Sequence, residues 1–438
     1  MKIGILGGGL AGLTLGNNLK KDFKIFEKNN ECGGLCRTLQ KKGFTFDRGG
    51  SHIIFSRNKE ILNYMTRLIG ENKNKIKRNT KILFKKNYVK YPFENGLHDL
   101  PKRDNFECLY YFIQNFIKKE RGEIAPPINF KEWMYYTFGE GITEKYLLPY
   151  NEKIWNYPAD KMNVDWVKGR VPSPPIGDIV KSSLGIKTEG YAHQLYFYYP
   201  KKEGIHSLIK SLEKPIKDKI KTDIELEKIE KYDGKWRIEY NNGKSELFDR
   251  IVSTIPLQEI LKLIENVPKK VENAINDLIC NSLITIMVGI NKPELNNISW
   301  LYIPGREDGR FNRVSFPFNF SSEVVPKGKS SLLAEITCNY NDDVWSMDNQ
   351  KLIGKTINDL DKLEIIDKND VCFSEIVRSK YAYIIFDHNY QKNIQIAYDY
   401  FEKLGIKLCG RFSEFKYLNM DATIESALNA ARIYKEVE

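Results

Sequence analysis

The sequence predicts an α/β protein whose N-terminal part is built on a parallel sheet. An apolar strand, a glycine-rich turn and the start of a helix follow one another in residues 2–18, KIGILGGGLAGLTLGNN. A second strand follows at residues 23–28, FKIFEK, and residues 407–434 again have the pattern of a strand, a glycine turn and a helix. Strands that alternate with helices are the units from which parallel sheets are assembled.

The first glycine turn has the spacing GxGxxG, formed by Gly7, Gly9 and Gly12. Such a turn lets backbone N–H groups and the N-terminus of the helix approach a pyrophosphate. Glu27 ends the second strand, where a carboxylate can accept hydrogen bonds from both ribose hydroxyls of an adenosine. The order of strand, turn, helix, strand and acid predicts a Rossmann-like dinucleotide site. A glycine-rich turn in another kind of α/β protein would explain the glycines but not Glu27.

A second glycine turn, NNECGGLCRTL, favours FAD over a nicotinamide dinucleotide. Gly33, Gly34, Arg37 and Thr38 resemble the second glycine motif of the glutathione-reductase-like flavoproteins, in the branch that contains the amine oxidases. A second turn without side chains lets the backbone pass close to the rest of a long cofactor. Arg37 is expected to contact a phosphate or to pack near the flavin end.

The next segment, GFTFDRGGSHIIFS, places one of only five histidines in the chain directly after two glycines. In flavoproteins of this shape the segment runs alongside the isoalloxazine. Gly49 and Gly50 permit close approach, so His52 is expected on or beside the flavin ring. The alternative is a histidine whose hydrogen bonds are satisfied in the core or at the surface.

Composition narrows the class of protein further. The chain has 438 residues and a net charge of +11, but its lysines are spread along the whole length, so we expect no nucleic-acid partner. The seven cysteines include no CxxC pair, so we expect neither a metal site nor a disulfide framework. The apolar runs are too short for a membrane span, and a strand begins at once at the N-terminus, so we expect a cytoplasmic protein.

The order of elements predicts three parts. The FAD-binding domain is expected in residues 1–80 with 205–260 and 400–438. A helical domain is expected in residues 100–190. An antiparallel-sheet substrate domain is expected in residues 81–99 with 191–204 and 280–390. The predicted fold is therefore a glutathione-reductase-like FAD-binding domain with a helical insertion and an antiparallel substrate sheet.

Over essentially its whole length the sequence resembles the UDP-galactopyranose mutases, most closely the eukaryotic-type ones. The motifs that carry the resemblance occur in the family's order and are DRGGSHIIFS, YPFEN, PYNEKIW, KGRV, WLYIPGREDGRFNR, YAYIIFD and GRFSEFKYLNMD. The resemblance implies interconversion of UDP-galactopyranose and UDP-galactofuranose for cell-surface glycan synthesis. In that reaction N5 of reduced FAD attacks the anomeric carbon and UDP leaves. The covalent flavin–sugar intermediate opens the ring, which recloses as the furanose, and UDP then reattaches. NAD(P)H as the reductant and a homo-oligomeric state are left open.

The resemblance also implies roles for individual residues. The residues implied in catalysis are His52, Arg170 and Arg313. The residues implied in binding the cofactor are Gly7, Gly9, Gly12, Glu27, Gly34, Arg37, Gly50, His52, Gly410, Arg411 and Asp421. The residues implied in binding the nucleotide sugar are Tyr91, Glu94, Asn151, Arg170, Gln194, Trp300, Tyr302, Arg313, Tyr383 and Tyr417.

Three departures from the family leave the sugar and the base open. Glu94 stands where the family commonly has glutamine, Gln194 stands where asparagine is common, and Ile384 replaces the proline after Tyr383. One rival interpretation is an FAD-dependent oxidoreductase of the amine oxidase and protoporphyrinogen oxidase class. Another is a flavin-binding protein without catalysis.

Overall fold

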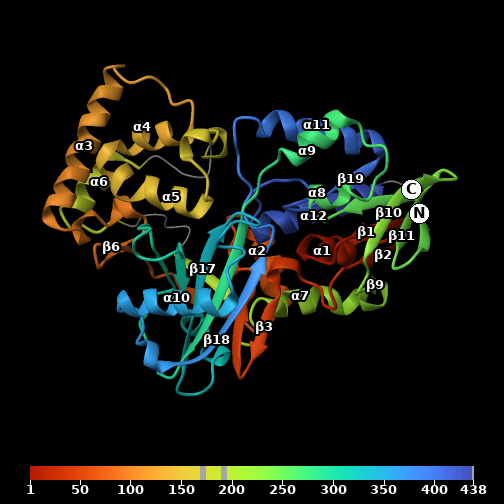
Figure 1. The fold of residues 1–438 in the computed structure, drawn as a ribbon, viewed down its shortest axis with the longest axis horizontal. Helices are drawn as coiled ribbons and strands as arrows, with labels where there is room; N and C mark the ends of the chain where they lie inside the picture. The colour runs from red at the N-terminus through yellow and green to blue at the C-terminus, as the bar shows by residue number, and fades with distance from the viewer. Residues whose placement is uncertain (168–173, 189–194, 437–438) are drawn as a thin grey trace.

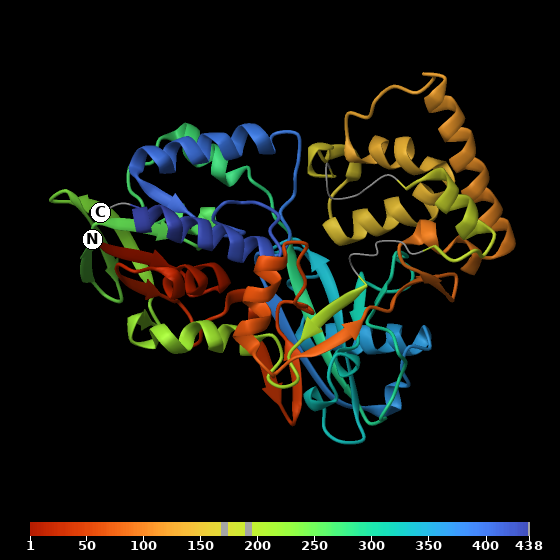
Figure 2. The same cartoon turned by 180° about the vertical axis from the view of Figure 1, so that it is seen from behind.

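Three groups of elements make up the protein in a computed structural model that describes residues 1–167, 174–188 and 195–436. A parallel sheet with its covering layers holds both chain termini, as Figure 1 shows. A bundle of helices lies at the opposite end of the molecule, and a large mixed sheet lies beside the two (Figure 2). No helix in the described part of the chain is long and apolar enough to cross a membrane.

The parallel sheet has five strands and confirms the predicted α/β class. Its strands in spatial order are β19 (Ile406–Leu408), β13 (Arg250–Ser253), β1 (Lys2–Leu6), β2 (Asp22–Phe26) and β9 (Ile220–Lys221). The central strand β1 pairs in parallel with β13 and β2 and is buried from Ile3 to Leu6. Because layers cover both faces, β1 shows a nearly continuous apolar run instead of an alternating pattern.

Different layers cover the two faces of this sheet. Helices pack on one face, namely α1 (Leu10–Asn18), α7 (His206–Glu213) and α12 (Met420–Glu436), with α2 (Lys59–Ile69) beside them. The other face meets a three-stranded antiparallel sheet and three helices: β10 (Leu226–Tyr232), β11 (Lys235–Tyr240), β12 (Lys244–Phe248), α8 (Leu257–Leu261), α9 (Lys269–Asn276) and α11 (Tyr390–Leu404).

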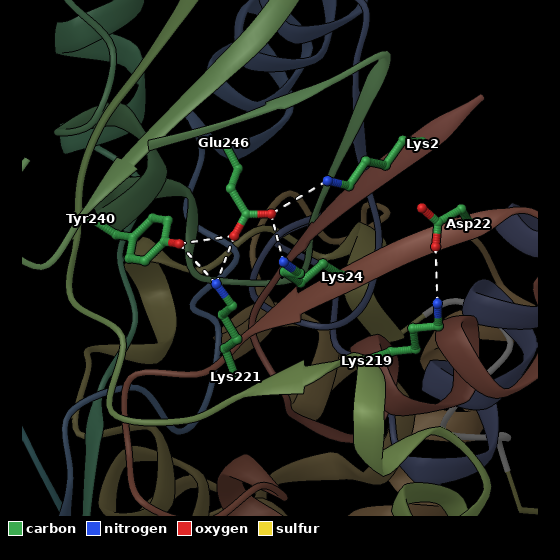
Figure 3. Close-up of polar contacts among 7 residues, drawn as sticks. All are labelled: Lys2, Asp22, Lys24, Lys219, Lys221, Tyr240 and Glu246. Atoms are coloured by element: carbon green, nitrogen blue, oxygen red, sulfur yellow. Dashed lines mark hydrogen bonds and ion pairs between the residues drawn. The ribbon is translucent and has the colours of Figure 1, made fainter. Parts of the chain in front are cut away.

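A carboxylate on β12 ties the three-stranded sheet to the parallel sheet (Figure 3). The Glu246 carboxylate contacts the ammonium groups of Lys2, Lys24 and Lys221 at 3.3, 2.5 and 2.6 Å, and it accepts a hydrogen bond from the Tyr240 hydroxyl at 2.8 Å. The three lysines belong to β1, β2 and β9, so one acid joins three neighbouring strands. Burial alone would raise the pKa of Glu246, but the lysines and Tyr240 outweigh it and lower that pKa to about 2.

The second large sheet has seven strands. In spatial order they are β18 (Val371–Ser379), β14 (Ser282–Ile290), β17 (Ser330–Cys338), β16 (Arg313–Ser315), β15 (Trp300–Tyr302), β6 (Thr80–Phe84) and β7 (Asn87–Lys90). All neighbouring pairs are antiparallel except β15 and β6, which run parallel. Helix α10 (Asn349–Lys362) packs against this sheet, and the hairpin of β3 (Thr38–Lys41) and β4 (Phe44–Asp47) contributes phenylalanines that meet β14, β17 and β18.

The remaining elements form the helical bundle and one short sheet. The bundle contains α3 (Lys102–Glu120), α4 (Phe130–Ile142), a π-helical turn (Thr143–Leu147), α5 (Leu148–Trp155) and α6 (Ile176–Ser183). The short sheet pairs β5 (Asn74–Lys77) with β8 (Tyr196–Tyr199). Helix α2 ends at Ile69, because Gly70 turns the chain with φ +54° and β5 follows. The predicted domain boundaries stay a prediction.

Candidate active site

One large cavity, of about 1810 Å³, is lined by residues from all three groups of elements. The parallel-sheet part contributes both glycine turns and the end of β2. The mixed sheet contributes Tyr302 and Arg313, and the helical bundle contributes Tyr146, Tyr150 and Asn151. Pockets for a single small ligand are commonly about 300–1,000 Å³, so this volume suits a dinucleotide together with a substrate.

The first glycine turn has the geometry of a pyrophosphate cradle. Gly7 has φ +100°, and a Cβ on Gly12 would lie 2.0 Å from the Gly7 carbonyl oxygen, so α1 can start this close to β1 only with glycine there. A Cβ on Gly9 would meet open space, which leaves the backbone of the turn accessible to a ligand. Glu27 lines the cavity at the end of β2, and its carboxylate accepts a hydrogen bond from the Gly8 backbone N–H at 2.8 Å.

The second glycine turn lies against the first. The Gly33 N–H donates to the Gly8 carbonyl at 2.8 Å, and both Gly33 and Gly34 have positive φ, +122° and +57°. The Arg37 side chain is held back toward this turn, since its Nε–H donates to the Gly34 carbonyl at 3.1 Å. The two turns therefore present bare backbone to the same stretch of the cavity.

The C-terminal turn completes the candidate cofactor site. Gly410 has φ +89°, and a Cβ there would lie 2.6 Å from the Ala11 side chain. Arg411 donates to the carbonyls of Ala382 at 2.7 Å and Leu418 at 3.1 Å and lines the cavity. Asp421 lines it from the first turn of α12.

Unsatisfied polar atoms mark where a flavin dinucleotide fits. Among the described residues, the Nε–H groups of Arg48 and Arg411 and the Ser51 hydroxyl are buried without a hydrogen-bond partner, and all three residues line the cavity. Buried polar groups are rarely left without partners, so a bound molecule with acceptor atoms is expected there. The glycine turns, Glu27 and these donors together fit the size and chemistry of FAD.

A buried carboxylate fixes the loop that carries His52. Asp47, at the end of β4, accepts hydrogen bonds from the Thr38 and Tyr199 hydroxyls at 3.1 and 3.0 Å. It also accepts from the backbone N–H groups of Ile205 at 3.0 Å and His52 at 3.3 Å. Four donors from different elements therefore converge on one acid, a role that sequence reasoning did not assign to Asp47.

His52 lines the cavity with a defined tautomer. Its Nδ1 lies 2.8 Å from the Gly50 carbonyl oxygen, which can only accept, so Nδ1 carries the proton and Nε2 is left as an acceptor. Burial lowers the pKa of His52 to about 4, and the nearby charges of Arg313 and Arg411 add to the effect. The imidazole is therefore neutral at physiological pH.

Arg313 lines the cavity with half of its guanidinium committed to a partner. Its Nε–H and one Nη2–H donate to the two oxygens of Glu335 at 2.9 and 2.6 Å. Within the described part of the chain the Nη1 hydrogens make no hydrogen bond, so they can serve a ligand. The Glu335 carboxylate also accepts from the Ser51 N–H at 3.4 Å, and a Cβ on Gly50 would lie 2.9 Å from it. Glu335 therefore couples Arg313 to the histidine loop.

Sequence reasoning missed Glu335, although a signal was present. It is the only acid in the nine-residue strand SSLLAEITC, which is buried throughout. A carboxylate in such a strand needs a cation or several donors, because burying an isolated charge is very costly.

Two of the tyrosines predicted to bind the substrate, Tyr383 and Tyr417, lie next to each other and close to Arg411. The rings of Tyr383 and Tyr417 stack with centroids 6.1 Å apart, and the Arg411 guanidinium lies 4.6 Å from the centroid of Tyr417. Burial, opposed by the nearby Arg313, raises the pKa of Tyr383 well above its usual value, so its hydroxyl keeps its proton. Tyr302 follows on β15, opposite Arg313 on β16. Protonated hydroxyls and guanidinium groups are donors of the kind that a phosphate accepts from.

A cluster of aromatic rings extends the cavity toward the helical bundle. Tyr302 lies 5.1 Å from Tyr91 and 5.1 Å from Tyr150 by ring centroids, and Glu94 lines the cavity close by. Asn151 also lines it, with its amide donating to the Leu147 carbonyl at 2.8 Å within the helix.

Three residues predicted to bind the nucleotide sugar are not found in the described lining of the cavity. Trp300 is buried beside Phe197 and Phe320 and is absent from the described lining of the cavity. Arg78 does line the cavity, and its guanidinium lies 4.8 Å from the centroid of the Trp300 ring. Arg170 and Gln194 lie outside the described residues, so their roles stay predictions.

Comparison with known proteins places the chain in a family. The sequence profile of the "Flavin containing amine oxidoreductase" proteins matches residues 10–433. The chain belongs to this family. A curated relative, the 4,4'-diapophytoene desaturase (4,4'-diaponeurosporene-forming) of Staphylococcus aureus strain COL, is 44% identical over 52 residues. That match spans only 11% of this chain and 10% of the desaturase. Membership implies a flavin cofactor, in agreement with the cradle described above.

Solved structures share the fold over the full length of the chain. One is a crystal structure of a reduced UDP-galactopyranose mutase, with a TM-score of 0.90 and 24% identity, covering 100% of this chain and 96% of that one. Another is a putative protoporphyrinogen oxidase from Exiguobacterium sp. 255-15, with a TM-score of 0.76 and 18% identity, covering 99% of each chain. At these identities the likeness shows the fold alone, and one fold supports several chemistries.

Proposed function

We propose that the protein is a flavin-dependent nucleotide-sugar mutase that interconverts UDP-galactopyranose and UDP-galactofuranose. The observation that carries the proposal is the group of donors around Arg313, in the cavity that His52 also lines: the Nη1 side of the Arg313 guanidinium with the hydroxyls of Tyr302 and Tyr383. A cavity lined in this way offers an anionic diphosphate several donors at once. The likeness to the reduced mutase supports the same assignment.

Individual residues have separate roles in the proposed reaction. Reduced FAD, when bound, supplies a nucleophilic nitrogen for the anomeric carbon of the sugar. Arg313 stabilises the negative charge that develops on the diphosphate as the glycosidic bond breaks, and Glu335 holds the guanidinium in place for this purpose. His52 stays neutral beside the flavin, so that it adds no charge and presents Nε2 as an acceptor. Arg170 is proposed as the second guanidinium of the diphosphate site.

The rival function is true oxidation, as in the amine oxidases and the protoporphyrinogen oxidases, and family membership and the fold agree with it equally well. The charges near His52 argue against an amine substrate. The charge of Arg313 is offset by Glu335, but Arg411, which forms no ion pair among the described residues, lies close enough to lower the pKa of the histidine, and it would repel a substrate ammonium in the same way. An amine oxidase needs a cavity that accepts an amine.

The test is an assay of dithionite-reduced enzyme with UDP-galactofuranose, run beside an oxygen-uptake assay with amines. Turnover that needs reduction, without amine-dependent oxygen uptake, is the expected result. Oxygen uptake with an amine, or equal turnover by the oxidised enzyme, would contradict the mutase assignment.

Arg313→Ala sharpens this test. It should lose about 2–4 kcal/mol of transition-state stabilisation, as when one preorganised donor is removed, while flavin content stays normal. The matched control is Arg310→Ala, which removes an exposed arginine three residues earlier and should leave turnover unchanged. Near-wild-type turnover by Arg313→Ala would show that the arginine does not act on the diphosphate.

A further inference from the structure

A buried asparagine joins two walls of the candidate active-site cavity. Asn281 lies directly before β14 and is fully buried. Its side-chain N–H groups donate to the carbonyls of Ile154 and Trp155, at the end of α5, at 3.0 and 2.9 Å. Its side-chain oxygen accepts from the backbone N–H of Tyr383 at 3.0 Å. One amide therefore connects the helix that carries Asn151 with the segment that carries Tyr383, and both of these residues line the cavity.

The end of α5 needs hydrogen-bond donors from outside the helix. The last carbonyls of an α-helix have no partner within it, and leaving such a group buried and unpaired costs about 1–3 kcal/mol. Asn281 serves two of these carbonyls. The Thr337 hydroxyl, on β17 of the mixed sheet, serves a third, the Lys153 carbonyl, at 2.8 Å. The last turn of α5 is therefore fixed to the mixed sheet.

The backbone of Tyr383 depends on the same amide. The Tyr383 carbonyl accepts from the Asn281 backbone N–H at 2.9 Å, and the Asn281 carbonyl accepts from the Ala382 N–H at 2.9 Å. Because Ala382 occupies that carbonyl, the Asn281 side chain supplies the acceptor for the Tyr383 N–H. The Tyr383 ring also meets the Trp155 ring edge-on, with centroids 6.0 Å apart. Loss of the amide would therefore release both the Tyr383 backbone and the helix turn against which its ring packs.

Asn281 can affect a ligand only through these neighbours, because it is absent from the described lining of the cavity. A donor stabilises the charge of a transition state best when it is held in place beforehand. Misplacing a group by about 1 Å can cost on the order of a hundredfold in rate. We propose that Asn281 is a positioning residue, which fixes the Tyr383 hydroxyl for the diphosphate. The inference rests on the proposed function and adds to it a residue that does not touch the substrate.

The experiment is a double-mutant cycle on the dithionite-reduced, flavin-loaded enzyme with UDP-galactofuranose. Asn281→Ala removes the amide, and Tyr383→Phe removes the hydroxyl that the amide positions. We expect Asn281→Ala alone to lower kcat about tenfold and to change KM less than about twofold, because the hydroxyl contributes most as charge develops on the diphosphate. In the Tyr383→Phe enzyme the same change should lower kcat less than about twofold, because the hydroxyl through which Asn281 acts is already absent.

Each outcome decides a different point. A loss of kcat that persists undiminished in the Tyr383→Phe enzyme, or a loss confined to KM, overturns the inference about Asn281 while the mutase proposal stands. Absence of turnover by the reduced wild type overturns the proposed function and the inference with it. The matched control is Asn319→Ala, which should leave kcat unchanged. The Asn319 amide also donates to two carbonyls, those of Asn296 and Ile298 at 3.1 and 2.8 Å, but outside the described lining of the cavity. If Asn281→Ala does not fold, Asn281→Ser, whose single donor cannot serve both helix carbonyls, takes its place in the cycle.

Discussion

Replacing Glu335 by glutamine should destabilise the protein strongly, although the side chain keeps its shape. Glu335 is only 1% exposed and holds the Arg313 guanidinium through two hydrogen bonds of 2.9 and 2.6 Å. Breaking a buried ion pair by removing one partner typically costs 3–5 kcal/mol, because the other charge is left uncompensated. Glutamine still offers one oxygen to the guanidinium, a hydrogen bond worth about 1 kcal/mol. The expected loss in the free energy of unfolding is therefore about 3 kcal/mol.

The assay is urea unfolding of the flavin-loaded protein, with Glu375→Gln as the matched control. Glu375, on β18 of the same sheet, pairs with Lys41 at 2.5 Å, but both side chains are partly exposed. Exposed pairs contribute about 0–1 kcal/mol, so this variant should unfold close to the wild type. Equal losses in the two variants would refute the reasoning that burial makes the Glu335–Arg313 pair important. Reduced turnover with normal flavin content would locate the effect at Arg313.

Two further predictions concern the cofactor cradle and the acid-sensitive contact between the sheets. Gly12→Ala should lower the flavin-to-protein ratio of the purified protein, because its Cβ would lie 2.0 Å from the Gly7 carbonyl oxygen. The control is Gly354→Ala on α10, which should leave the ratio unchanged because its Cβ would meet open space. Glu246 has its pKa lowered to about 2 in the folded protein, so its stabilisation is complete above its ordinary pKa of 4.5 and is lost as the pH falls toward 2. The free energy of unfolding of Glu246→Gln should lack this pH-dependent contribution, which is about 1–2 kcal/mol because the lysines are partly exposed. If the free energy of unfolding of the variant depends on pH between 5 and 2 as it does in the wild type, the prediction is wrong.

Much of the cofactor cradle could be predicted from local sequence. Gly7, Gly12 and Gly34 act through backbone geometry, which depends on a few neighbouring residues, and the spacing of Glu27 follows from the length of one strand–helix–strand unit. The fold class followed from the same local patterns. The parallel pairing of β15 with β6 did not, because it joins residues more than two hundred positions apart and leaves no periodic signal.

The sequence by itself determined the α/β class, the two glycine turns and the types of side chain available for a diphosphate and a base. Only the tertiary structure decided how those side chains are used. It paired Arg313 with Glu335 across two strands, placed Trp300 behind Arg78, and enclosed Glu94 among rings from the hairpin and the helical bundle. The physical reason is that hydrogen bonding and desolvation depend on neighbours brought together by folding, and these neighbours set the charge state of each group. The chemistry of an acid or a base at this site is therefore a property of its surroundings.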